Sequence, residues 1–108
     1  KVMKIVAVTS CATGIAHSYM AAEALKKAAK ELGDVIKIEV QGALGLENKL
    51  SSRDIQEAEL VIWAVDVGVR EKERFKGKII VQLGPNEAIR NAKKVIIEAK
   101  NKLDNDQS

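Results

Sequence analysis

The sequence contains very few of the residues that mark several common classes of protein. Aromatic side chains make up 3% of its 108 residues, and it has one proline, one histidine and one cysteine. A single cysteine cannot form an intrachain disulfide, and it is typical of a protein in a reducing cytosol. One cysteine and one histidine are too few ligands for a zinc site, so we expect no metal and no cofactor.

Long apolar runs and a strong excess of charge of one sign are also absent. No apolar run approaches the roughly 20 residues that span a bilayer, and the charged first residues do not resemble a secretion signal. The net charge is +3, from 18 basic and 15 acidic residues, with no basic stripe. We therefore expect a soluble, cytoplasmic domain that binds no nucleic acid. The sequence leaves open whether it stands alone or belongs to a longer polypeptide.

The sequence does contain a repeated alternation of apolar strands and amphipathic helices. Strands are predicted at residues 2–8, 35–41, 60–65 and 78–83. Helices are predicted between or after them at residues 17–32, 51–58 and 85–103. This alternation predicts one α/β domain with a four-stranded parallel sheet, strand order 2-1-3-4, and helices on both faces. The domain should span residues 1–103, followed by a frayed polar tail at residues 104–108.

The predicted strand at residues 35–41 differs from the others because its residues alternate. Its apolar residues fall on one face, and Lys37, Glu39 and Gln41 fall on the other. We expect the polar face to meet water at an edge of the sheet. Residues 42–49 contain two glycines and predict a loop.

The segment 9–18, which we call the Cys11 loop, is the strongest candidate for a chemical site. Cys11 directly follows a buried strand, at the edge where parallel sheets bind ligands. A helix begins in this loop, and its free N–H groups and dipole should lower the pKa of the thiol and favour a phosphoryl group bound to sulfur. The residues expected to bind that group are Ala12, Thr13, Gly14, Ile15, Ala16, His17 and Ser18.

His17 and Asp66 need separate consideration as candidates for this site. His17 follows Cys11 by six positions, and it could bind phosphoryl oxygens, pair with the thiolate, or only bind a nearby carbonyl in the first helical turn. A cysteine phosphatase has arginine at this position, so its absence favours a carrier over a hydrolase. Asp66 ends the third predicted strand, and we expect it to cap the next turn rather than to face the Cys11 loop.

Residues 7–25, with Cys-Ala-Thr-Gly-Ile-Ala-His at 11–17, resemble the phosphocysteine loop and first helix of fructose-type IIB domains of the phosphoenolpyruvate-dependent sugar phosphotransferase system. Further segments at 39–42, 45–48, 64–66 and 74–78 also fit that family, in the same order. The family usually has proline directly after the cysteine. Here Ala12 restores an N–H group and loosens the loop.

The resemblance implies a phosphoryl carrier. In this family a IIA partner carries phosphohistidine, the IIB cysteine takes the phosphoryl group, and a sugar bound by the membrane IIC domain receives it. Cys11 would be the nucleophile, and the sugar would be fructose or a related one. The domain would lie at the inner face of the membrane through IIC. Arg70, Lys72 and Arg74 could form part of a docking surface for IIA.

Three other functions remain open from the sequence. A regulatory domain would have the same fold and phosphocysteine, but it would report its phosphorylation state to an attached transcription factor. A cysteine phosphatase would hydrolyse the phosphoryl group, although the missing arginine disfavours it. A flavodoxin-like binding domain would hold Cys11 only as an inert, buried side chain.

Overall fold

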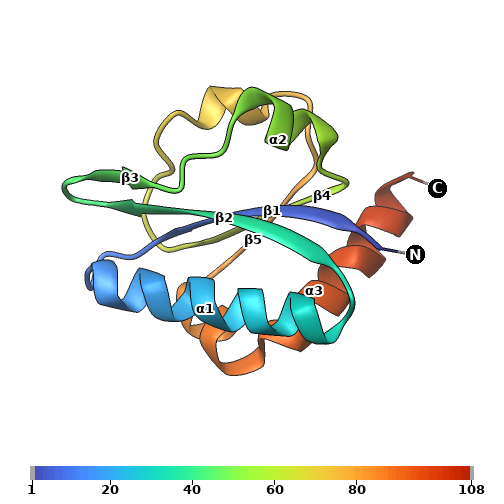
Figure 1. Cartoon of the computed structure of the whole chain (residues 1–108), viewed down its shortest axis with the longest axis horizontal. Helices are drawn as coiled ribbons and strands as arrows, with labels where there is room; N and C mark the ends of the chain where they lie inside the picture. Colours follow the sequence, from blue (N-terminus) through green and yellow to red (C-terminus); the bar gives the residue numbers. More distant parts are fainter. Residues whose placement is uncertain (1, 108) are drawn as a thin grey trace.

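A five-stranded sheet forms the centre of the structure, a computed structural model that describes residues 2–107 (Figure 1). Its strands are β1 (Lys4–Ser10), β2 (Val35–Gly42), β3 (Gly45–Glu47), β4 (Leu60–Val65) and β5 (Ile80–Leu83). Their order across the sheet is β3-β2-β1-β4-β5, and β3 is antiparallel to β2 whereas the other neighbours are parallel. The predicted α/β class is confirmed. The four predicted strands lie parallel in the predicted order 2-1-3-4, which corresponds to β2-β1-β4-β5. The prediction of a purely parallel sheet of four strands is wrong, because β3 adds a fifth, antiparallel strand beside β2.

The fifth strand comes from residues 42–49, which the glycines predict to be a loop. They instead form a hairpin in which Val40 pairs with Glu47 and Gly42 pairs with Gly45. Gly45 has φ 140°, a backbone conformation that residues with a Cβ rarely adopt. A strand as short as β3 leaves no alternating pattern in the sequence, so it could not be predicted from periodicity.

Helices cover both faces of the sheet, as predicted. The helices α1 (Ile15–Glu31) and α3 (Pro85–Gln107) pack together on one face (Figure 1). The short helix α2 (Ser52–Glu57) and the 3-10 helix η1 (Lys72–Phe75) lie on the other face (Figure 1). Among residues 2–107, no helix is long and apolar enough to cross a bilayer.

Two apolar clusters hold these layers to the sheet. The larger cluster lies beneath α1 and α3, and its fully buried members include Ile5, Leu25 and Ile62. The smaller cluster lies beneath α2 and η1, where the rings of Phe75 and Trp63 meet edge to face with 5.4 Å between their centroids. The core is therefore mainly aliphatic, as the low aromatic content requires.

The last helix is longer than the sequence predicts. Residues 104–107 continue α3, although their polarity predicts a frayed tail, and α3 is kinked at Asn91. The side chain of Leu103 is buried in the larger cluster, which fixes the final turns against the sheet. Residue 108, the last of the predicted tail, lies outside the described residues.

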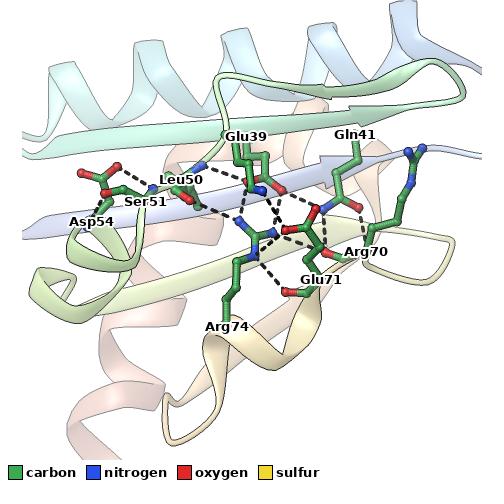
Figure 2. Close-up of polar contacts among 9 residues, drawn as sticks. Glu39, Gln41, Leu50, Ser51, Asp54, Arg70, Glu71 and Arg74 are labelled. Carbon is green, nitrogen blue, oxygen red and sulfur yellow. Dashed lines mark hydrogen bonds and ion pairs between the residues drawn. The ribbon is translucent and has the colours of Figure 1, made fainter.

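The polar face of β2 is the largest departure from the sequence prediction. Glu39 and Gln41 should meet water according to the alternating pattern, but only 0% and 1% of their surface is exposed. The connection at residues 66–77 crosses this face and covers both side chains (Figure 2). Lys37, nearer the start of the strand, is the exposed member of the set.

Candidate functional site

Cys11 lies just beyond β1, at the edge where three parallel strands end. Ser10 pairs with Gln41 of β2 and with the last residue of β4, so Gly42 and Asp66 follow at the same edge. Cys11 and Gly42 both line a hollow of about 600 Å³ between the Cys11 loop and the β2–β3 hairpin. The thiol is partly exposed there, which makes it accessible to a reacting group.

The backbone of the Cys11 loop turns directly into α1. The Gly14 N–H donates to the Cys11 carbonyl at 3.3 Å, and Gly14 has φ 130°, which favours glycine at this position. No side chain caps the N-terminus of α1. Because the first N–H groups of a helix have no partner within it, this end of α1 favours an anion near Cys11.

His17 contacts the thiol. Its Nδ1 lies 3.0 Å from Cys11 Sγ and 3.2 Å from Thr13 Oγ1. The same nitrogen therefore contacts both the thiol and the hydroxyl. If Nδ1 carries a proton, it donates to one of these groups; if it does not, it accepts a hydrogen bond from the S–H or the O–H group. Of the alternatives for His17, pairing with the cysteine is the contact that this geometry provides.

Asp66 also faces the Cys11 loop. Its Oδ1 accepts a hydrogen bond from the Ala12 N–H at 2.8 Å, and its own N–H donates to the Ser10 carbonyl at 3.2 Å. The prediction that Asp66 caps the next turn rather than facing the loop is wrong, because the register of β1 and β4 places it beside Ala12. Proline at position 12 would have no N–H to donate.

The pKa of the Cys11 thiol is raised, whereas the helix N-terminus alone predicts a lowered value. Burial of the sulfur is the largest cause, and the negative charge of Asp66 adds to it. The hydroxyl groups of Thr13 and Ser18 act in the opposite direction on the thiol pKa, but their effect does not outweigh burial. The thiol is therefore mainly protonated at neutral pH.

A buried ion pair lies beside the site on the face that carries α2 and η1. Arg74 Nη1 and Nη2 each donate to one oxygen of Glu39 at 2.9 Å (Figure 2). Glu39 also accepts from the Leu50 N–H at 2.9 Å and from Gln41 Nε2 at 2.8 Å. Burial would raise the pKa of Glu39, but these hydrogen bonds outweigh it and hold the pKa below its ordinary value. Only 14% of the Arg74 side chain is exposed, so its predicted role in docking is not supported.

Gln41 extends this network towards the hollow. Its Oε1 accepts from the Arg70 N–H at 2.9 Å, and its Nε2 donates to the Arg70 carbonyl at 3.1 Å. The guanidinium of Arg70 in turn donates to the carbonyl of Gly42. The network thus joins the end of β2 to the connection after β4, the two segments that flank Cys11.

Comparison with known proteins identifies the family. Residues 6–98 match the family model described as "PTS system, Lactose/Cellobiose specific IIB subunit". The chain belongs to the IIB family of the sugar phosphotransferase system. The resemblance to this family drawn from the sequence is confirmed.

Individual relatives of this IIB domain are fructose-like. It is 49% identical over 89 residues to the "PTS system fructose-like EIIB component 2" of Escherichia coli strain K12, covering 82% of this chain and 84% of that protein. It is also 49% identical over 98 residues to the "PTS system fructose-specific EIIABC component" of Bacillus subtilis strain 168, covering 91% of this chain and 15% of that protein. The solution structure of an Enzyme IIB subunit from Escherichia coli K12 superimposes with a TM-score of 0.89, at 38% identity and full coverage of both chains.

Sequence reasoning located Cys11 and His17 of this IIB domain but missed the roles of Asp66 and Arg70. The first two lie in one continuous loop with a local pattern. Asp66 lies near Cys11 because β4 pairs with β1. Arg70 lies near it because its backbone binds Gln41 of β2, which also pairs with β1. The one available signal was the position of Asp66 directly after a buried strand that should run beside β1.

Proposed function

We propose that this IIB domain is a phosphoryl carrier in which Cys11 accepts a phosphoryl group from phosphohistidine of a IIA domain. It then passes the group to a sugar bound by a membrane IIC domain, and so works at the inner face of the membrane. The observation that carries the proposal is the 3.0 Å contact between Cys11 Sγ and His17 Nδ1 at the carboxyl end of β1. The fructose-like relatives favour fructose or a related sugar.

The first transfer forms an S–P bond and breaks the N–P bond of the IIA phosphohistidine. His17 Nδ1 takes the S–H proton as Cys11 Sγ attacks phosphorus. The electron pair of the broken N–P bond stays on the departing imidazole, which then takes up a proton. The N–H groups of the Cys11 loop and the first turn of α1 that do not already donate within the chain hold the phosphoryl oxygens, so catalysis consists of positioning and electrostatic stabilisation.

The second transfer uses the same groups in the reverse sense. A sugar hydroxyl attacks phosphorus, an O–P bond forms, and the S–P bond breaks. The electron pair of that bond returns to Cys11 Sγ, which regains a proton from His17. A raised thiol pKa suits this cycle, because the resting thiol is protonated and less open to oxidation. His17 then removes the thiol proton only when the IIA phosphohistidine is aligned with Cys11.

Intact-protein mass spectrometry tests the proposal. The domain is incubated with phosphoenolpyruvate, the general phosphotransferase proteins and a fructose-type IIA domain, beside a Cys11→Ala variant. We expect a gain of one phosphoryl mass in the native chain and no gain in the variant. An unmodified, well-folded native chain, tested with several active IIA domains, would contradict the carrier function. Restoration of sugar uptake together with a IIC domain then separates a transporter component from a regulatory domain.

A further inference from the structure

The hollow beside Cys11 has negative side chains around it but no cation in its lining. Glu47 is the charged residue among those that line it within residues 2–107, and Asp66 is bound to Ala12 at its rim. A phosphoryl group bears a charge of about −1.5 to −2 near neutral pH. A phosphoryl group at Cys11 would lie near the carboxylates of Glu47 and Asp66 and be repelled by them. A positively charged side chain from outside the lining would offset this repulsion.

Arg70 is held against the wall of this hollow. Its guanidinium donates to the carbonyl of Gly42, which lines the hollow together with Cys11. Gln41 lies opposite Ser10 in the parallel register of β1 and β2, so the next residue, Gly42, is level with Cys11. Neighbouring strands lie roughly 4.8 Å apart, a separation that a small movement of an arginine side chain can cover.

The backbone of Arg70 is fixed, whereas its charge is not neutralised. Gln41, with 1% of its surface exposed, binds both the N–H and the carbonyl of Arg70. The Arg70 guanidinium forms no ion pair with a carboxylate in the described part of the chain, and its side chain is turned away from the Glu39–Arg74 pair (Figure 2). Buried Gln41 therefore fixes the backbone of Arg70, while the guanidinium of Arg70 donates to the uncharged carbonyl of Gly42.

We propose that Arg70 binds the phosphoryl group on Cys11. Its guanidinium leaves the Gly42 carbonyl and donates to phosphoryl oxygens, in addition to the N–H groups of the Cys11 loop. Arg70 would contact the phosphoryl group from a separate segment, and not from the loop position at which a cysteine phosphatase has arginine. The inference rests on the carrier function proposed above and names a further residue of that site.

Phosphorylation kinetics and phosphorus NMR of three variants test this role. Arg70→Gln removes the charge, Arg70→Lys keeps it, and Lys76→Gln removes an exposed charge of the same connection as a matched control. We expect Arg70→Gln to slow phosphoryl transfer from IIA by about tenfold or more, the usual range for a lost charge-assisted hydrogen bond. In the phosphorylated protein, the second ionisation of the phosphoryl group should move to higher pH in Arg70→Gln, and Arg70→Lys should restore part of both properties.

The outcomes separate this role from its alternatives. Circular dichroism and thermal unfolding first establish that each variant is folded. If Arg70→Gln matches Lys76→Gln in both rate and phosphorus titration while the native chain is phosphorylated, the inference is overturned and the carrier function stands. A slower Arg70→Gln with an unchanged titration also overturns it, because Arg70 would then orient IIA only. A native chain that accepts no phosphoryl group overturns the carrier function and this role together.

Discussion

The carboxylate of Asp66 accepts a hydrogen bond from the Ala12 N–H at 2.8 Å, one residue beyond the cysteine. The bond joins the connection after β4 to the Cys11 loop, and it brings a negative charge close to the thiol. The family resemblance leads us to expect proline at the position of Ala12, and proline has no N–H to donate. The electrostatic environment of Cys11 in this chain therefore depends on the residue that follows it.

Replacing Asp66 with Asn should make Cys11 more reactive. Asn keeps an oxygen that accepts from Ala12 but removes the negative charge that helps to raise the thiol pKa, so the pKa falls and the thiolate fraction at pH 8 rises. The pH dependence of alkylation by iodoacetamide measures the change, and Asp54→Asn, which removes a carboxylate on α2, is the control. Identical alkylation profiles for the native chain and Asp66→Asn would mean that this carboxylate does not influence the thiol.

Replacing His17 with Gln should slow the phosphorylation of Cys11 by roughly a hundredfold near pH 7, the scale of a lost general base. The difference from the native chain should shrink as pH rises, because the thiolate then forms without help from His17. Single-turnover transfer from phosphorylated IIA, measured between pH 6 and pH 9, gives this profile. A loss that stays constant across this range would indicate that His17 only holds the loop in place.

Removing Arg74 alone should lower the free energy of unfolding strongly, because Glu39 then stays buried without its cation. Arg74→Leu leaves a buried carboxylate without its cation, and we expect it to lower the free energy of unfolding by about 3–5 kcal/mol. The double change Glu39→Leu with Arg74→Leu should cost clearly less than the sum of the single changes. Urea unfolding of the four proteins completes the cycle, and additive effects would show that the two side chains are not coupled.

The interaction of Asp54 with Lys37 should make stability depend on pH in the acid range. Hydrogen bonds from Lys37 and Ser51 hold the pKa of Asp54 at about 2, below its ordinary value of 3.8. A lowered carboxyl pKa stabilises the fold above the unfolded value, and the contribution is lost as pH falls from about 4 towards 2. The stability difference between the native chain and Asp54→Asn should therefore be largest above pH 4 and reach its minimum below pH 2. Urea unfolding at several pH values, with Glu23→Gln as control, measures it.

Much of the fold could be predicted because its signals are local. The continuous apolar runs of β1 and β4 indicate strands buried on both faces, and the structure places them at the centre of the sheet. Ser51 and Asp54 form a capping box at the start of α2, where the sequence predicts a helix. These features depend on residues that are neighbours in sequence, so the pattern contains the information.

The rest depends on contacts between distant segments. The alternation of β2 predicts that Glu39 meets water, since nothing near it in sequence shows that Arg74 will cover it. In the same way, the helix N-terminus predicts a low thiol pKa, but burial and Asp66 reverse the direction. A local pattern identifies Cys11 as the candidate nucleophile, whereas its charge environment is set by tertiary structure.

The β2–β3 hairpin also bears on how this domain behaves at high concentration. It covers the outer edge of β2 from Val40 to Gly42, whereas the stretch of β2 before Val40 has no strand on its outer side within residues 2–107. An uncovered edge can pair with another molecule and start aggregation. Lys37 lies in this open stretch, exposed and 2.7 Å from Asp54, where a charged side chain opposes the approach of a second strand. The same lysine that stabilises α2 thus protects the domain against self-association.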